Sequence, residues 1–271
     1  MNPRHITTAR HHNQNPQRSQ TFTTTFFSTA IQTTVTSIPA IARQWVYDLR
    51  NNYADSLYSS TLVIGLGVQW QPYSNAASTL QLCVDTDCLI FQLSHAPNIP
   101  ATLRRLLSDD RITFVGVHNG RDRNLLEGSD HQLHVEYLID LAREEGYGNI
   151  SMEDMAEDVL GFPGIVKPRE VGMSDWDQFW LTNEQVQYAC VDAYVSCLLG
   201  LSLGYGDDDD DGEDEDEEDD EDDEDGFGYG YDFDGEYLDY DDYCNPLNYN
   251  EDWEYDPFHC NPYNFYLSDS D

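Results

Sequence analysis

The stretch "LVIGLGVQW", residues 62–70, predicts a central β-strand whose two faces differ in character. Side chains of a strand alternate between its faces with a period of two. One face here is apolar and carries Leu62, Ile64, Leu66, Val68 and Trp70. The opposite face carries Gly65, Gly67 and Gln69. The apolar face predicts contact with a core, whereas two glycines and an amide stand on the face where a site is expected.

The segments around this strand predict an α/β domain with a mixed sheet flanked by helices. Runs of β-branched and apolar residues, two of them around the turn "DTD", predict further strands at 31–38, 78–84, 88–93 and 112–117. Apolar residues at helical spacing predict helices at 39–52, 99–109, 135–146, 151–161 and 182–201. In the last of these helices, Thr182 and Gln185 have the spacing of a capping box.

Charge divides the chain into three regions. The net charge is −39, and residues 207–271 hold 30 of the 52 acidic residues but none of the 13 basic ones. Within them, residues 207–225 contain 18 acids, a block that predicts a disordered acidic tail over 204–271. Residues 1–30 are rich in Ser, Thr, Asn and Gln and predict a disordered polar head. The folded domain is therefore expected over residues 31–203.

Cysteine usage and hydropathy predict an intracellular protein, in the nucleus or the cytoplasm. The six cysteines form no C-x-x-C pair, and four of them lie in apolar segments, which favours reduced core thiols. No apolar run reaches the length of a membrane span, and the N-terminus lacks a secretory signal pattern. The acid-poor head with three arginines leaves an organelle transit peptide as the alternative. No membrane partner is expected.

Two segments carry side chains suited to chemistry. In "FVGVHNGRDRNLL", residues 114–126, Asp122 follows a buried strand, where a lone aspartate is typical of a turn or a helix cap. In "QVQYACVDAYVS", residues 185–196, Tyr188 and Asp192 are four residues apart and share one helix face. Neither segment is specific when taken alone.

Taken together, these segments resemble the Werner-type 3′–5′ exonuclease domain of plants, in the DEDD group with a ribonuclease-H-like fold. The resemblance covers residues 31–203, and "LQLCVDTDCLIFQL", "DVLG" and "MSDWD" also fall where that family has similar segments. It implies that Asp122 and Asp192 lie at metal-binding positions. It also implies that Tyr188, Asp192 and Asp122 form the catalytic set of a nuclease that uses Mg²⁺ or Mn²⁺.

The first motif of that family, D-x-E-W-x-P, is altered in this chain. The corresponding stretch is "GVQWQP", residues 67–72, so that Gly67 and Gln69 stand in the places of the two carboxylates. Two divalent ions about 4 Å apart repel each other by something on the order of ten kcal/mol. Asp122 and Asp192 alone offset this repulsion poorly, and the neutral oxygen of Gln69 is a weak ligand for Mg²⁺. We therefore expect two-metal hydrolysis to be lost or greatly weakened.

Two further expectations concern the metal site. Restoring both carboxylates, by Gly67→Asp with Gln69→Glu, is expected to create metal binding. The alternative is a shifted ligand, for which Asp85, Asp87 and Asp140 are the candidates. None of them lies on the polar face of the first strand, so a degenerate site is preferred.

The charge balance limits the expected partners. Residues 31–203 carry 10 basic and 22 acidic residues, which predicts weak nucleic-acid binding because cations supply most non-specific affinity. Arg121, Arg123 and Trp70 are the candidate contacts. The acidic tail, with its interleaved aromatic residues, predicts docking of basic proteins, unless it only solvates the domain. A third alternative is self-inhibition, with the tail covering Arg104, Arg121 and Arg123.

The sequence therefore predicts an exonuclease-like domain that binds nucleic acid and has lost or weakened catalysis. A residual metal-dependent 3′–5′ exonuclease that trims DNA or RNA ends is the first alternative. A non-catalytic protein-interaction module is the second.

Overall fold

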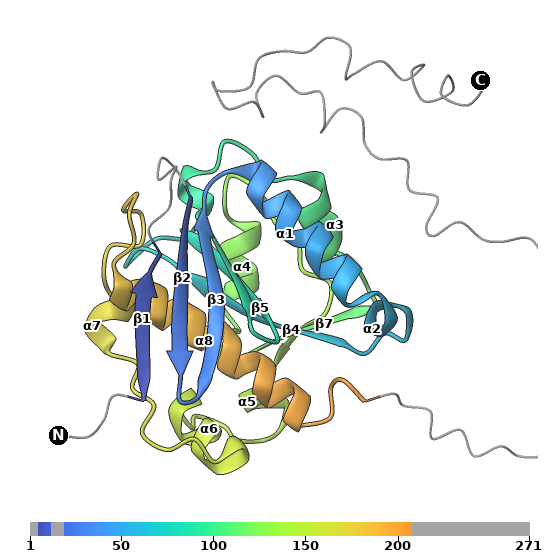
Figure 1. Ribbon diagram of the computed structural model, residues 1–271, viewed down its shortest axis with the longest axis vertical. Coiled ribbons are helices and arrows are strands. Elements are labelled where there is room, and N and C mark those ends of the chain that lie inside the picture. The colour runs from blue at the N-terminus through green and yellow to red at the C-terminus, as the bar shows by residue number, and fades with distance from the viewer. Residues whose placement is uncertain (1–4, 12–18, 208–271) are drawn as a thin grey trace, which may run out of the picture. The chain divides into compact units, whose positions relative to one another are not determined.

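The computed structural model describes residues 5–11 and 19–207, which form one mixed sheet with helices on both faces. The sheet has the strand order β1-β2-β3-β6-β5-β4-β7-β8 (Figure 1). The strands are β1 (Ile6–Arg10), β2 (Ser19–Phe26), β3 (Thr29–Thr36), β4 (Leu62–Gln69), β5 (Thr79–Val84), β6 (Asp87–Phe91), β7 (Ile112–Gly116) and β8 (Leu138–Asp140). Strands β3 and β6, β4 and β7, and β7 and β8 pair in parallel, and the other neighbours are antiparallel.

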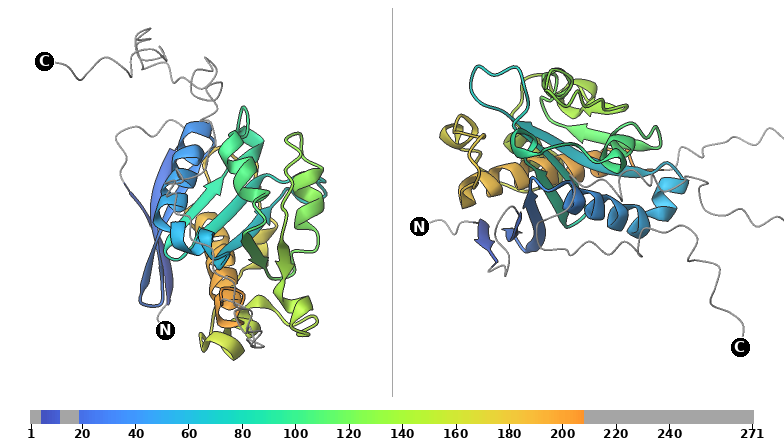
Figure 2. Two further views of the ribbon diagram at one scale, coloured as in Figure 1. Left: turned by 90° about the vertical axis from the view of Figure 1, so that its right-hand side faces the viewer. Right: turned by 90° about the horizontal axis from the view of Figure 1, so that it is seen from above.

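The helices form two layers, one on each face of the sheet (Figure 2). The first layer includes α1 (Pro39–Asn52), α2 (Ala54–Tyr58), α3 (Ala101–Leu107) and α4 (Asp122–Glu127). The second includes α5 (Leu141–Glu144), α6 (Met152–Leu160) and α8 (Asn183–Ser202), with α7 (Arg169–Gly172) beside α8. A short 3₁₀ turn, Leu93–His95, follows β6. Within residues 5–11 and 19–207, no helix is both long and apolar enough to cross a membrane.

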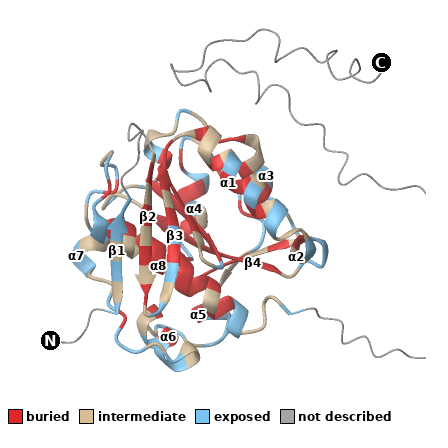
Figure 3. Cartoon of the chain, in the orientation of Figure 1, coloured by how far each residue is buried: buried red, intermediate tan, exposed pale blue. Residues whose placement is uncertain are grey.

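Strand β4 lies in the interior of the sheet, and every one of its residues is buried (Figure 3). Its apolar face, with Leu62, Ile64, Leu66 and Val68, joins the core under α1 and α3. Its other face lies against α8, where an added Cβ on Gly65 would overlap the carbonyl oxygen of Ala193. The division of faces predicted from the period of two is confirmed.

The N-terminal boundary predicted from composition is wrong. Strands β1 and β2 lie within residues 1–30, which we expected to be disordered, and β2 pairs along its whole length with β3. In "QTFTTTF", residues 20–26, the rings of Phe22 and Phe26 are buried while threonines alternate with them. Threonine is β-branched and favours strands, so a Thr-rich segment that looks polar in composition is a regular sheet strand.

The helix predicted at 135–146 is also partly wrong. Residues Leu138–Asp140 instead form β8, which pairs in parallel with β7, and only Leu141–Glu144 are helical. Pairing with a neighbouring strand outweighs a helical spacing that spans so few residues. The hairpin predicted around "DTD" is confirmed, because β5 and β6 pair antiparallel across it.

Helix α8 begins as the sequence predicts. The Thr182 side chain accepts a hydrogen bond from the backbone N–H of Gln185, and the Gln185 side chain accepts one from the backbone of Thr182, which completes the capping box. The cysteines of the described residues, Cys83, Cys88, Cys190 and Cys197, are buried and free. The predicted acidic tail lies outside the described residues from position 208 onward.

Candidate functional site

Strand β4 and helix α8 bring three of the predicted site residues together. The side-chain nitrogen of Gln69, Nε2, donates a hydrogen bond of 3.2 Å to Oδ2 of Asp192. A Cβ added to Gly67 would lie 3.1 Å from the same oxygen. The first-motif positions therefore face the aspartate of α8 directly, as the resemblance implies.

Close packing explains why this face of β4 is rich in glycine. Gly65 meets the backbone of α8 at Ala193 and Cys197, and Gly200 of α8 meets Val63 and Val115 of the sheet. The absence of side chains at both glycines lets α8 approach the strand backbone closely. This contact fixes the height of α8 above β4, and therefore the position of Asp192.

Asp122 begins α4 and is buried, with 7% of its surface exposed. Burial raises the pKa of Asp122 well above its ordinary value, and the negative charges of Asp192 and Asp140 raise it further. Lys167 acts in the opposite direction and lowers the pKa of Asp122. The structure thus places both expected metal-binding aspartates within one electrostatically coupled group.

Lys167 is a member of this group that the motif analysis missed. It follows α6 and precedes α7, and its Nζ forms an ion pair with Oδ1 of Asp192. Burial alone lowers the pKa of Lys167, but the negative charge of Asp192 and the hydrogen bond to it act in the opposite direction, and the pKa is raised. The side chain is therefore a cation. Its only sequence signal is that it is the one lysine of the chain.

Tyr188 lies one turn before Asp192 on α8 and borders the same cation. The Nζ of Lys167 is 4.9 Å from the centre of the Tyr188 ring, a cation–π distance. The ring packs against Trp176, with 6.0 Å between the ring centres. Burial raises the pKa of Tyr188, which keeps its hydroxyl neutral near pH 7.

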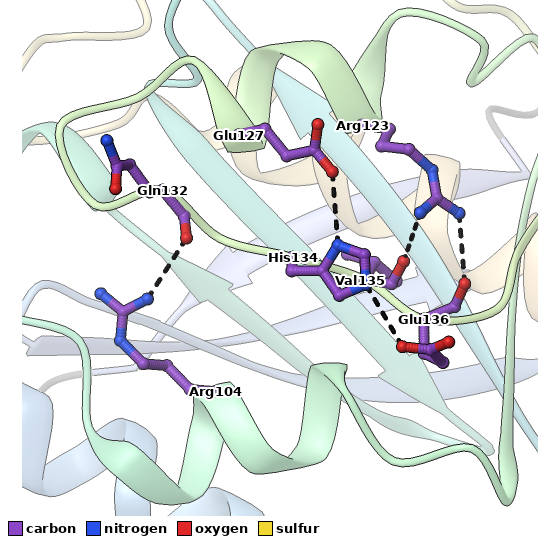
Figure 4. Close-up of polar contacts among 7 residues, drawn as sticks. All are labelled: Arg104, Arg123, Glu127, Gln132, His134, Val135 and Glu136. Carbon is purple, nitrogen blue, oxygen red and sulfur yellow. Dashed lines mark hydrogen bonds and ion pairs between the residues drawn. The ribbon is translucent and has the colours of Figure 1, made fainter.

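The predicted nucleic-acid contacts have partners within the domain. Arg121 lies over the ring of Trp70, at 5.4 Å from its centre, and donates to the carbonyl oxygen of Ser74 at 3.0 Å. Arg123 donates to the carbonyl oxygens of Val135 at 2.6 Å and Glu136 at 3.3 Å (Figure 4).

Arg104 also donates hydrogen bonds to backbone carbonyl oxygens, those of two residues that precede Val135 in the chain. It donates to the carbonyl oxygen of His131 at 2.8 Å. It also donates to the carbonyl oxygen of Gln132 at 3.4 Å (Figure 4). Arg104 on α3 and Arg123 on α4 therefore hold the segment that leads into β8. A nucleic-acid role for Arg121 and Arg123 stays a prediction, and these contacts show a structural one.

The candidates for a shifted metal ligand lie apart from Gly67 or are held elsewhere. In the β4–β5 register Gly67 faces Gln81, and Asp85 lies four residues farther along, about 13 Å at the rise of a strand. Asp87 lies beyond it, at the start of β6. Asp140 accepts a 3.0 Å hydrogen bond from the backbone N–H of His118.

The donor set does not fit a divalent metal. Among residues 5–11 and 19–207, no group of three or more His, Cys, Asp or Glu side chains is arranged to hold an ion. Both carboxylate oxygens of Asp192 already accept from nitrogen donors, one on Gln69 and one on Lys167. Each oxygen keeps a second lone pair, but the ammonium of Lys167 at Oδ1 would repel a divalent ion that approached it.

Comparison with known proteins agrees with the fold. A family model described as 3'-5' exonuclease matches residues 58–204, more than half of the chain. The chain belongs to the 3′–5′ exonuclease family. Its mixed sheet flanked by helices is the ribonuclease-H-like exonuclease fold.

Three curated relatives come from a plant and an animal. A 3'-5' exonuclease of Arabidopsis thaliana is 24% identical over 155 residues, covering 51% of this chain and 51% of that protein. The mouse bifunctional 3'-5' exonuclease/ATP-dependent helicase WRN is 31% identical over 153 residues, covering 52% of this chain and 11% of that protein. Mouse exonuclease 3'-5' domain-containing protein 2 is 33% identical over 159 residues, covering 53% of this chain and 24% of that protein. The match therefore spans about half or less of these relatives.

Solved structures of exonucleases also match. The crystal structure of the EXD2 exonuclease domain soaked in Mg and GMP is 29% identical, with a TM-score of 0.37, and the match covers 63% of this chain and 87% of that chain. The Aedes aegypti Nibbler EXO domain is 16% identical, with a TM-score of 0.46, over 57% of this chain and 83% of that chain.

The buried carboxyl of Asp122 gives a pH-dependent prediction. Its pKa is higher in the folded chain than in the unfolded chain, so ionisation favours unfolding as the pH rises above about 4. Asp122→Asn is therefore expected to stabilise the domain, by about 1 kcal/mol near pH 7. The gain should vanish toward pH 4. Urea unfolding at several pH values measures it.

Asp109 provides the matched control, because its pKa shifts in the opposite direction. Burial raises the pKa of Asp109, but hydrogen bonds and charge from Arg111, with Arg50, outweigh burial and lower it. Asp109→Asn should therefore destabilise the domain at neutral pH, with a loss that shrinks as the pH falls. Equal effects of the two substitutions at every pH would contradict the assigned environments.

Proposed function

We propose that this domain binds nucleic-acid ends and has lost, or nearly lost, two-metal hydrolysis. The observation that carries the proposal is that Gln69 hydrogen-bonds to Asp192, while a Cβ at position 67 would lie 3.1 Å from the same carboxylate. These are the places where the resemblance expects two carboxylates, and the chain offers a bare Cα and an amide. Membership of the 3′–5′ exonuclease family supports a nucleic-acid ligand. The narrower plant Werner-type relation is part of this proposal.

Without carboxylates at positions 67 and 69, the site lacks two ligands and the negative charge that would attract divalent ions. In two-metal hydrolysis one ion activates the attacking oxygen and the other stabilises the leaving oxygen. Tyr188 and Asp192 retain their positions on α8, but Asp192 is engaged by Gln69 and Lys167. The remaining site is suited to binding a strand end without cleaving it.

A nuclease assay tests this proposal. The full chain is incubated with a labelled single strand and with a recessed duplex, of DNA and of RNA, in Mg²⁺ or Mn²⁺. We expect no metal-dependent shortening above the rate of the Asp192→Asn variant, while anisotropy at low salt detects weak binding. Metal-dependent shortening by the unaltered chain that Asp192→Asn abolishes would establish the alternative, a residual exonuclease.

The acidic segment supports a second proposal, a protein partner with a basic surface. The chain places 18 acids within residues 207–225, and opposite charge on a partner gives fast and salt-sensitive association. The same charges repel nucleic acid from any neighbouring site. This segment lies outside the described residues, so the proposal rests on its charge.

Deleting residues 208–271 tests both consequences of this charge. We expect tighter nucleic-acid binding by the shortened chain, with a larger gain at about 50 mM than at about 200 mM salt, because salt screens the repulsion. Binding to a basic protein such as a histone should weaken, and the melting temperature should change little. Equal nucleic-acid affinity at low salt, with and without the segment, would exclude self-shielding.

A further inference from the structure

The side chain of Lys167 is largely covered and is held by an ion pair, unlike that of a mobile surface lysine. Its side chain retains 16% of its exposed surface, and its Nζ pairs with Oδ1 of Asp192, whose side chain is equally covered. The partner oxygen of Asp192, Oδ2, accepts from Gln69 at 3.2 Å. One carboxylate is thus held by a cation on one oxygen and by an amide on the other.

Three contacts fix the position of this cation. The ammonium lies over the ring of Tyr188, at 4.9 Å from its centre, in addition to its ion pair with Asp192. The backbone N–H of Lys167 donates to Oε1 of Glu153 at 3.1 Å, which ties this segment to α6. Because both its backbone and its side chain are held, the ammonium of Lys167 has a fixed position in the site.

The charge of Lys167 also offsets part of the negative charge of the site. The negative charges of Asp192 and Asp140 raise the pKa of Asp122, and Lys167 is the cation that opposes them there. Ionised carboxylates clustered in the interior of a protein are stabilised by a compensating cation. In a metal-dependent nuclease divalent ions supply that charge.

We propose that the ammonium of Lys167 is the resident cation of this site and takes the charge-balancing place of a divalent ion on Asp192. This deepens the proposed function, on which it rests, by naming the group that replaces the metal. It also changes what is needed to rebuild a metal site. Carboxylates at positions 67 and 69 are not sufficient, because the ammonium would still hold Asp192 and repel the incoming ion.

The test compares variants that carry a charged or an uncharged side chain at position 167 and are otherwise identical. The full chain is prepared as G67D/Q69E, as G67D/Q69E/K167M and as G67D/Q69E/K167R. The Arg variant is the matched control, because it keeps the cation and a long side chain. The readout is the rise in melting temperature with increasing Mn²⁺, which reports binding to the folded state. Each variant carries the same acidic tail, so ions gathered by the tail contribute equally.

We expect the K167M triple variant to bind Mn²⁺ with an apparent Kd at least tenfold lower than that of either variant that retains a cation. Equal Mn²⁺ affinity of the Met and Arg variants would overturn the proposal. So would a double variant that binds as tightly as the Met triple variant. Either result would show that Lys167 does not occupy the place of the ion.

A second pair of variants tests the proposal if the variants with Gly67→Asp do not fold. A Cβ at position 67 lies 3.0 Å from Oε1 of Gln81, so Gly67→Asp requires that side chain to move. The pair Q69E/K167M and Q69E/K167R keeps Gly67, and circular dichroism checks that both are folded. The Met variant should again show the larger Mn²⁺-dependent rise in melting temperature, and equal rises would overturn the proposal.

The outcomes separate this inference from the proposed function. Metal-dependent degradation of nucleic acid by the unaltered chain would refute the loss of hydrolysis. Equal metal affinity of the Met and Arg variants, with no degradation by the unaltered chain, would refute only the role of Lys167. In that case the missing carboxylates alone would account for the inactive site.

Discussion

Lys167→Met is expected to destabilise the unaltered domain by about 3 kcal/mol, because it removes one partner of a buried ion pair. The remaining carboxylate of Asp192 would keep its hydrogen bond from Gln69 but lose its counter-charge, next to a second buried acid at Asp122. Removing one partner costs far more than the net value of the pair, because an uncompensated charge stays buried. Urea unfolding near pH 7 measures the loss.

A double-mutant cycle separates the ion pair from simple loss of packing. Asp192→Asn in the Lys167→Met background removes both charges, so most of the lost stability should return. Lys167→Met and Asp192→Asn should each be more destabilising than the double substitution. If the two single effects simply add, the ammonium and the carboxylate are not coupled, and the ion pair does not hold this site together.

The elements with a strong local period could be predicted from the sequence. Strand β4 has apolar residues at every second position, with two glycines and Gln69 between them, and α8 combines a capping box with twenty residues of helix. The resemblance predicts Asp122 and Asp192 as site residues, and the charge of Asp192 acts on Asp122 in the structure. Local rules succeed here because propensity, capping and burial agree at each of these elements.

Lys167 could not be predicted, because no periodic pattern or motif contains it. It lies in the segment between α6 and α7, 25 positions before its partner, and only the tertiary fold brings the two together. The contacts that the arginines make within the domain could not be predicted for a related reason. Whether Arg123 faces a phosphate or a carbonyl oxygen depends on the path of residues 135–136, which the sequence does not show.

Composition misled the prediction of the N-terminal boundary. Ser, Thr, Asn and Gln are typical of disordered segments, but threonine in alternation with phenylalanine also suits a sheet strand. The buried rings of Phe22 and Phe26 decide between these alternatives, and Phe26 packs on Phe162 and on Tyr194 of α8. The period of two was present in "QTFTTTF", and it was outweighed by the composition of the surrounding residues.

Gly65→Ala is expected to destabilise the domain by about 3 kcal/mol, the upper part of the range for overpacking a core. The new methyl group would overlap the carbonyl oxygen of Ala193 and lie 2.8 Å from the backbone nitrogen of Cys197. Both contacts are with the backbone of α8, so no side-chain rotation relieves them. The helix must move away from β4, and Asp192 moves with it.

The control for this prediction is Gly120→Ala, which adds the same methyl group where only Oδ2 of Asp140 lies within 4 Å, at 3.9 Å. Gly120 is exposed, so its substitution should change stability by less than about 0.5 kcal/mol. Urea unfolding of both variants gives the comparison, and amide spectra of the Gly65 variant should show shifts along α8 that the Gly120 variant lacks. If Gly65→Ala is tolerated as well as Gly120→Ala, then α8 does not rest on the bare backbone of β4. The glycine face of the strand would then need another explanation than close packing, namely the space left at Gly67 beside Asp192.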